Sequence, residues 1–265
     1  MTRPVAQVWL LGVLAAVSLA LWTAHAPRQA HAARPATRLA AAPLPLFRRP
    51  DGAWLARTRP LRVVRPPAPL PHLVAFVRRS VALRSRPFGP VVARLGTRTQ
   101  FGSPQALSVV RRRGDGRWLA VTTPELGNRT LGWVDARAGG LAYARTRLAL
   151  EIDLSRRVLL VRSGRRVLRS ASVGIGRPGS PTPTGRFAVT DKLDGAAINP
   201  VYGCCILALS AHQTNVPAGW RGGDRMAIHA GPLGAVSAGC VHAAGDDLRY
   251  LTRLVPLGTP VTIHP

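Results

Sequence analysis

Two side chains near the C-terminal end of the sequence, His229 and Cys240, are of the types that carry out nucleophilic catalysis. His229 follows the apolar run Met226–Ile228, which predicts a buried strand, and Cys240 follows a turn of small residues. A cysteine nucleophile needs a nearby base, and imidazole is the side chain whose pKa lies closest to neutral pH. Since one loop joins the two residues, we predict that they form a nucleophile and base pair.

The neighbours of this pair predict how it is assisted. Small residues before the cysteine let backbone N–H groups turn towards a developing oxyanion, so we expect those of Gly239 and Cys240 to stabilise it. The carbonyl of Ala230 is expected to hold the second ring nitrogen of His229 and fix its tautomer, in place of the acid of a triad. Ser237 is expected to form a hydrogen bond near the site rather than to act as the nucleophile.

These residues belong to a longer pattern. Ile228-His-Ala-Gly231, a loop, and then Ser237-Ala-Gly-Cys-Val241 resemble the signature of the L,D-transpeptidases (YkuD-type domains), which cross-link bacterial peptidoglycan. Further segments resemble upstream and downstream parts of the same family: Val173–Gly176, Thr182–Phe187, and Asp246, Leu248, Gly258, Thr259 and Val261. The resemblance covers residues 147–265 and rests on three blocks in the family's order.

The resemblance implies a β-sandwich with a helix and an acyl transfer that needs no cofactor. The thiolate of Cys240 would attack an amide of a tetrapeptide stem, D-Ala would leave, and an amine of a neighbouring stem would form a 3→3 cross-link. If water attacks instead, the enzyme is an L,D-carboxypeptidase. The resemblance also implies that carbapenems acylate the same thiol.

The sequence departs from the family's pattern at three points. The loop between His229 and Cys240 is short, Ala238 stands where histidine is common, and His242 stands where the family usually has an arginine that helps to hold the substrate. We assign substrate binding to Ser237, His242 and Gly231. For His242 the alternative is that it only begins the segment before the last helix.

Two other functions remain open. A papain-like wall endopeptidase would have its cysteine before its histidine and at the start of a helix, the reverse of the order here. A non-catalytic wall-binding protein would keep the fold but not the chemistry. His212 is a rival base, but it lies in a polar segment without a neighbouring nucleophile.

The remaining cysteines, Cys204 and Cys205, are adjacent. A disulfide between neighbours is strained and rare, so we predict two small buried side chains at the start of a strand. The sequence has no cysteine and histidine spacing typical of zinc, and we expect no metal site.

The formal net charge is +26, and Lys192 is the single lysine, so arginine supplies nearly all of the positive charge. This excess of positive charge favours an anionic partner, namely a cell-wall polymer or a membrane surface. The alternative is that the many arginines reflect the codon bias of a GC-rich genome. No nucleic-acid motif is present and only 5% of residues are aromatic, so we do not expect nucleic acid as a partner.

The N-terminal part predicts export to the cell envelope. Residues 1–26 combine Arg3 with an apolar stretch, which indicates a signal peptide or an uncleaved membrane anchor. Residues 27–71 are rich in proline, alanine and arginine and predict an extended linker. The bulk of the protein is therefore expected outside the membrane, on the periplasmic or cell-wall side.

Residues 73–138 resemble a bacterial SH3-like domain, a small β-barrel that often contacts wall peptide in such proteins. Six short runs separated by turn residues predict its strands: Val74–Val77, Val81–Leu83, Val91–Ala93, Leu107–Val110, Trp118–Val121 and Gly132–Val134. We expect Trp118 and Trp133 in its core, with a ligand platform as the alternative reading.

Residues 147–265 predict a second β unit with one helix. The alternating runs Leu148–Leu154, Val158–Val161 and Arg166–Ile175 predict an antiparallel meander. Four further runs predict strands: Phe187–Thr190, Ile206–Leu209, Met226–Ile228 and Pro260–Ile263. The helix is expected to begin at Asp246 or Asp247 as N-cap, to bury Leu248, Leu251, Leu254 and Val255, and to end before Gly258. The fold class is therefore mostly β, with a small barrel followed by a sandwich that carries a C-terminal helix.

Overall fold

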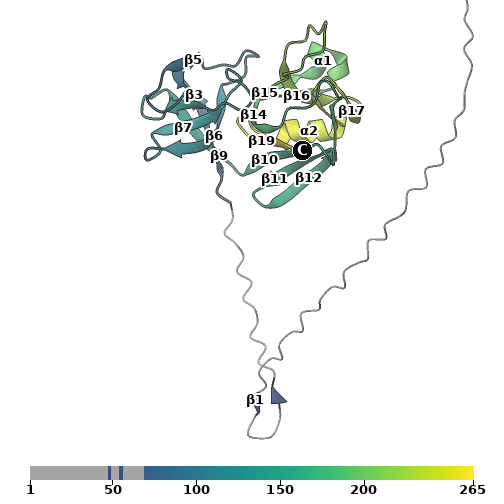
Figure 1. Cartoon of the computed structure of the whole chain (residues 1–265), viewed down its shortest axis with the longest axis horizontal. Coiled ribbons are helices and arrows are strands. Elements are labelled where there is room, and N and C mark those ends of the chain that lie inside the picture. The colour runs from purple at the N-terminus through teal and green to yellow at the C-terminus, as the bar shows by residue number, and fades with distance from the viewer. Residues whose placement is uncertain (1–46, 49–53, 56–68) are drawn as a thin grey trace, which may run out of the picture. The chain divides into compact units, whose positions relative to one another are not determined.

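A computed structural model describes residues 47–48, 54–55 and 69–265 (Figure 1). The chain divides into the units Met1–Val63 and Val64–Pro265. In the first unit, β1 (Phe47–Arg48) and β2 (Trp54–Leu55) pair antiparallel. The predicted signal or anchor segment and most of the predicted linker lie outside the described residues. Within the described part of the chain, no helix is long and apolar enough to cross a membrane.

The chain from residue 72 to residue 146 forms a seven-stranded sheet. Its strands are β3 (His72–Val77), β4 (Val81–Arg84), β5 (Val91–Leu95), β6 (Ala106–Arg113), β7 (Trp118–Thr122), β8 (Gly132–Asp135) and β9 (Leu141–Thr146). All six predicted strands are present, and β9 adds a seventh that pairs along β3. The order β5-β4-β8-β7-β6-β3-β9 has β5 and β9 as its ends, and the SH3-like barrel stays a prediction.

The core of this first sheet alternates with period two in β4 and β8, whereas β7 is buried along its whole length. Leu83, Leu107 and Val121 are buried, while the arginines at the end of β6 point to solvent. Trp118 is buried as predicted, and Trp133 is half-buried.

The rest of the chain forms a ten-stranded sheet in the order β12-β11-β10-β19-β14-β15-β16-β18-β13-β17. Its strands are β10 (Leu148–Asp153), β11 (Val158–Ser163), β12 (Arg166–Ser172), β13 (Gly174–Gly176), β14 (Gly185–Asp194), β15 (Cys205–His212), β16 (Arg225–Ala230), β17 (Gly234–Ser237), β18 (Val241–Ala243) and β19 (Pro260–His264). The first half of β14 pairs with β19 and its second half pairs with β15, with an irregularity at Val189 between them. A strand that changes partners at a bulge is how a sheet folds over into two layers.

The predicted meander β10-β11-β12 is confirmed, but Arg166–Ile175 is not one strand. The chain leaves β12 after Ser172, and β13 joins the opposite part of the sheet, beside β17 and β18. Gly174 permits this pairing because a Cβ there would lie 2.3 Å from the carbonyl oxygen of Pro232.

The predicted C-terminal helix is α2 (Gly245–Leu254), and it packs Leu248, Leu251 and the following Val255 into the core of the ten-stranded sheet. Two details of the prediction are wrong. Leu254 is 36% exposed, and Ala244, which has no side-chain acceptor, precedes the helix as N-cap.

The two aspartates lie in the first turn of α2, where a negative charge is favourable, and pair with arginines instead of capping the helix. Asp247 binds Arg169 and Asp246 binds Arg249. A second, one-turn helix that was not predicted, α1 (Gly195–Ile198), precedes the 3-10 turn η1 (Pro200–Tyr202).

Loops of the seven-stranded sheet contact the ten-stranded sheet through specific hydrogen bonds. The amide of Asn128 donates to the carbonyl of His212 and accepts from its N–H, both at 2.7 Å. The His212 ring bonds to the Pro124 carbonyl at 2.6 Å through Nε2 and to Asp224 at 2.9 Å through Nδ1. Both ring nitrogens are therefore engaged in holding the loop that leads into β16.

Candidate active site

The parallel pairing of β16 with β18 brings the predicted base beside the predicted nucleophile. The register places His229 opposite His242, and their ring centroids lie 4.8 Å apart. Cys240 directly precedes β18 and is two residues from His242, so extended chain geometry favours the same face. His229, Cys240 and His242 all line one cavity of about 440 Å³.

His229 is held in the tautomer that a base requires. Its Nδ1 lies 2.7 Å from the carbonyl oxygen of Ala230. Because a carbonyl only accepts, Nδ1 carries the proton and Nε2 keeps its lone pair. This is the hydrogen bond predicted for Ala230. The pKa of His229 is lowered to about 4, mainly by burial and also by the neighbouring His242, while the bond to Ala230 partly offsets this. The imidazole is therefore neutral at neutral pH.

Cys240 is half-buried, and it is the only free cysteine of the chain. Burial raises the pKa of its thiol, and a backbone hydrogen bond with Ala227 partly offsets this. With a neutral imidazole beside it, the resting pair is a thiol and an imidazole rather than an ion pair.

The turn before Cys240 is closed by Ser237. The Ser237 hydroxyl donates to the carbonyl of Cys240 at 2.6 Å and accepts the N–H of Gly239 at 3.0 Å. Ser237 thus forms the local hydrogen bond that was predicted. The same contact uses the N–H of Gly239, so this geometry does not support the predicted oxyanion role of that residue.

Two side chains that sequence reasoning missed brace the same turn. Thr182 accepts the N–H of Gly176 at 2.8 Å and donates to the carbonyl of Gly239 at 2.7 Å. The amide of Gln213 donates to the carbonyl of Ala238 at 2.8 Å. The threonine belongs to a segment that resembles the family, which was the only signal for it.

Replacing Gly239 by alanine is expected to destabilise the protein. Gly239 has φ of 123°, and an added Cβ would lie 2.0 Å from Nε2 of Gln213, which is held by three carbonyls. Strained backbone alone costs about 1–3 kcal/mol, and the clash adds to it. Thermal unfolding followed by circular dichroism measures the loss.

Gly179→Ala is the matched control for this variant. Gly179 also has positive φ, 89°, but open space around the added Cβ. We expect the midpoint of unfolding to fall further for Gly239→Ala than for Gly179→Ala. Equal midpoints would show that the contact with Gln213 does not restrict the turn.

His242 flanks His229 and is 9% exposed. Its Nδ1 lies 2.9 Å from the carbonyl of Pro232, which leaves its other ring nitrogen for the cavity. Gly231 is not among the described residues that line the cavity; it makes room for His242, because a Cβ there would lie 2.5 Å from Nδ1 of that ring. The substrate-binding role predicted for Gly231 is therefore not supported by its position.

His229 also packs against Tyr202 of η1, a contact that was not predicted. The two rings meet edge to face with centroids 4.8 Å apart. Gly203, which directly follows Tyr202, has φ of 71°, and a Cβ added to it would lie 2.7 Å from the Cβ of Ala230. The 3-10 turn therefore approaches β16 closely enough to bury the base.

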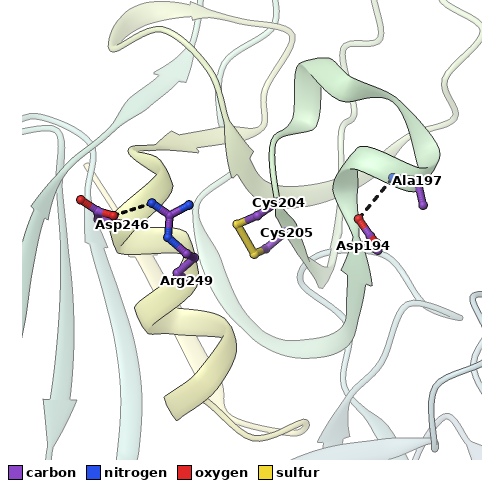
Figure 2. The surroundings of a disulfide bond; sticks show 6 residues. All are labelled: Asp194, Ala197, Cys204, Cys205, Asp246 and Arg249. Carbon is purple, nitrogen blue, oxygen red and sulfur yellow. Dashed lines mark hydrogen bonds and ion pairs between the residues drawn. A yellow bond between two sulfur atoms is a disulfide. The ribbon is translucent and has the colours of Figure 1, made fainter.

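Cys204 and Cys205 form a disulfide with each other, although a disulfide between neighbours was expected to be rare (Figure 2). Cys205 is buried at the first position of β15, as predicted for a strand start. The ladder with β14 begins at Cys205, opposite Asp194, so Cys204 lies outside it and its side chain is free to turn towards its neighbour. Cys240 therefore has no disulfide partner.

The rest of the cavity is largely apolar, and loops from both parts of the described chain contribute to it. Phe101, from the loop between β5 and β6, lines it together with Trp220 of the loop before β16. The guanidinium of Arg225 lies 5.6 Å from the centroid of the Phe101 ring. His212 does not line the cavity, which argues against it as the rival base. No group of three metal-ligating side chains occurs in the part of the chain that the structure describes.

A comparison with protein families matches residues 147–263 to the L,D-transpeptidase catalytic domain (YkuD). The chain contains an L,D-transpeptidase catalytic domain. The match includes His229, Cys240 and all ten strands of the second sheet except the last residue of β19. No curated protein matches the chain.

Several solved structures are similar to this chain. L,D-transpeptidase 1 of Mycobacterium tuberculosis has 19% identity and a TM-score of 0.33, with 51% of this chain and 77% of that chain covered. Bd1075 of Bdellovibrio bacteriovorus has 25% identity and a TM-score of 0.37, with 45% and 48% covered. An L,D-transpeptidase from Mycobacterium smegmatis has 17% identity and a TM-score of 0.35, with 60% and 90% covered. The chain thus spans about half the length of Bd1075.

Proposed function

We propose that this protein is a peptidoglycan L,D-transpeptidase that transfers a tetrapeptide stem through Cys240 to an amine of another stem. The observation that carries the proposal is the pairing of β16 with β18, which sets a neutral, tautomer-fixed His229 and the single free thiol in one cavity of the catalytic domain. Stem peptides of peptidoglycan are the proposed substrates.

The acylation step follows from the protonation states of the pair. Nε2 of His229 takes the proton of the thiol while sulfur bonds to the scissile carbonyl carbon, and the oxygen becomes an oxyanion. The C–N bond then breaks, the imidazolium gives its proton to the leaving nitrogen, and D-Ala departs. A thioester between Cys240 and the stem remains. No cofactor enters this step.

Deacylation repeats the same proton transfers in reverse. An amine of a second stem attacks the thioester carbonyl, His229 accepts a proton from that nitrogen, and the returning proton restores the thiol of Cys240. The product is a 3→3 cross-link. Attack by water instead would release a tripeptide stem, which is the L,D-carboxypeptidase reaction.

The test is a product analysis of purified residues 64–265, which form one unit of the chain. The protein is incubated with a tetrapeptide donor, with and without a second stem carrying a free amine, and the products are identified by mass spectrometry. A cross-linked dimer with loss of one D-Ala supports the transpeptidase. Tripeptide alone supports the carboxypeptidase, and unchanged donor in a folded, reduced sample supports a wall-binding protein without activity.

We also propose that the protein works on the outer side of the cytoplasmic membrane. The supports are residues 1–26, which have the pattern of a signal or anchor, and the net charge of +26, which favours an anionic wall polymer or membrane surface. Fractionation of cells that express the full chain, with Cys240 labelled by a membrane-impermeant thiol reagent, tests this. Labelling only after lysis would contradict it.

A further inference from the structure

Arg177 lies at the mouth of the catalytic cavity, directly after β13. Its side chain is exposed and lines the same cavity as Cys240 and Ser237. Its backbone N–H donates to the carbonyl of Ser237 at 2.9 Å, and its carbonyl accepts the N–H of Ser180 at 3.0 Å. The residue is therefore fixed on both sides of its Cα.

The segment that carries Arg177 is tied directly to the cysteine turn. Gly176, its neighbour, donates to the hydroxyl of Thr182, which in turn donates to the carbonyl of Gly239. Gly176 also has no room for a side chain, because a Cβ would lie 2.3 Å from the carbonyl oxygen of Ser180. The base of the Arg177 side chain is thus held in a constant position relative to the residues beside the nucleophile.

The other charged groups that line the cavity are already paired. Arg225 donates to the Leu209 carbonyl at 2.7 Å and to the Thr190 hydroxyl at 2.9 Å, and Asp224 bonds to His212. His229 is neutral at neutral pH because burial lowers its pKa to about 4. Among the described residues, Arg177 has no hydrogen-bond, ion-pair or ring partner for its guanidinium. The cavity that Cys240 lines therefore presents one unpaired positive charge.

A guanidinium held in this way is suited to a carboxylate. Its planar array of N–H donors matches the two oxygens, and charge-assisted bonds of this kind are about twice as strong as neutral ones. In the proposed donor the leaving D-Ala carries a carboxylate on the carbon next to the scissile nitrogen. That group is present whatever diamino acid the stem contains.

We infer that Arg177 binds the terminal carboxylate of the donor stem and so selects donors that end in a free acid. The inference rests on the proposed function, since it takes a stem peptide as the ligand. It assigns specificity, not chemistry, to Arg177.

Binding to the Cys240→Ala protein tests the inference without turnover. Two tetrapeptides are compared by calorimetry, one ending in D-Ala and one ending in D-Ala amide. We expect the acid to bind about 10- to 100-fold more tightly than the amide, the range for a hydrogen bond to a charged group. Adding Arg177→Gln is expected to remove most of this preference, and Arg177→Lys, which keeps the charge but not the planar donors, to keep part of it.

Arg186→Gln is the matched control, because Arg186 is an exposed residue of β14 that does not line the cavity. It removes the same charge and is expected to keep the full preference for the acid. A preference that persists in Arg177→Gln, or that falls equally in Arg186→Gln, would overturn the inference. So would equal binding of acid and amide before any arginine is changed.

Failure of the proposed function gives a different result. If the unsubstituted protein converts neither peptide but Arg177→Gln still removes the preference for the acid, Arg177 is a carboxylate site in a protein that is not a transpeptidase. The same two arginine substitutions are also made in the protein that retains Cys240, where alkylation of this thiol by the neutral reagent iodoacetamide at equal rates confirms that the cavity is intact.

Discussion

Cys240→Ala is expected to abolish acylation of the protein and to lower donor turnover by at least about 10⁴-fold, since nothing else in the cavity replaces the sulfur. The measurement is intact mass after incubation with a carbapenem, together with the rate of D-Ala release from a tetrapeptide. The unsubstituted protein should gain one adduct per chain, because Cys204 and Cys205 are joined to each other.

The matched control for this prediction removes the other two sulfur atoms. Cys204→Ser with Cys205→Ser is expected to keep the single adduct, provided that thermal unfolding shows a folded protein. Cys240→Ser keeps the size of the side chain but offers a much weaker nucleophile, and it should behave as the alanine variant does. An adduct on Cys240→Ala would place the reaction elsewhere, and a folded protein that forms no adduct at all would favour a wall-binding scaffold.

His229→Gln is expected to lower kcat/KM by about 10²- to 10⁴-fold, the usual contribution of a general base. Glutamine retains an amide that fills part of the space between Tyr202 and His242 but cannot take the proton of the thiol. A loss of less than about 10-fold would mean that Cys240 is deprotonated by another route.

The pH dependence of the unsubstituted protein distinguishes a base from a merely structural histidine. The active form is the neutral imidazole, and its pKa in the free protein is lowered to about 4, mainly by burial. Activity is therefore present above this pKa and is lost as the pH falls through about 4, rather than through the usual value of 6.5. We expect kcat/KM to be flat from about pH 5.5 to neutral pH.

His264→Gln serves as the control for the pH profile. His264 lies at the end of β19, 3.3 Å from Glu151 and away from the cavity. Removing this histidine should leave the loss of activity at low pH unchanged. If kcat/KM instead falls with a midpoint near pH 6.5, or still falls at low pH in His229→Gln, the titrating group is not His229.

The sequence by itself determined the strands and the chemical pair. Apolar runs located thirteen of the described strands, and where a strand is half-buried, as β4 and β8 are, its side chains follow the two-residue period. His229 and Cys240 were found because a short segment joins the end of a predicted strand to a turn of small residues, within a pattern that resembles the family. The tautomer of His229 was also predictable, because its partner Ala230 is the next residue.

Local preference was not sufficient where distant groups compete for the same atoms. Asp246 and Asp247 have the chemistry of helix caps, but Arg169 and Arg249 bind their carboxylates instead. Gly239 was expected to offer its N–H to substrate, but Ser237 accepts it. Arg166–Ile175 reads as one strand, but two different neighbours divide it between β12 and β13.

Only the tertiary structure decided the environment of the site. Thr182 and Gly239 are 57 residues apart, and Tyr202 reaches His229 from a turn in another segment. The lowered pKa of His229 comes mainly from burial by such contacts, and the unpaired guanidinium of Arg177 is visible only once the partners of every other cavity charge are known. A residue's type and local pattern are set along the chain, whereas its solvation and partners depend on groups that folding alone brings together.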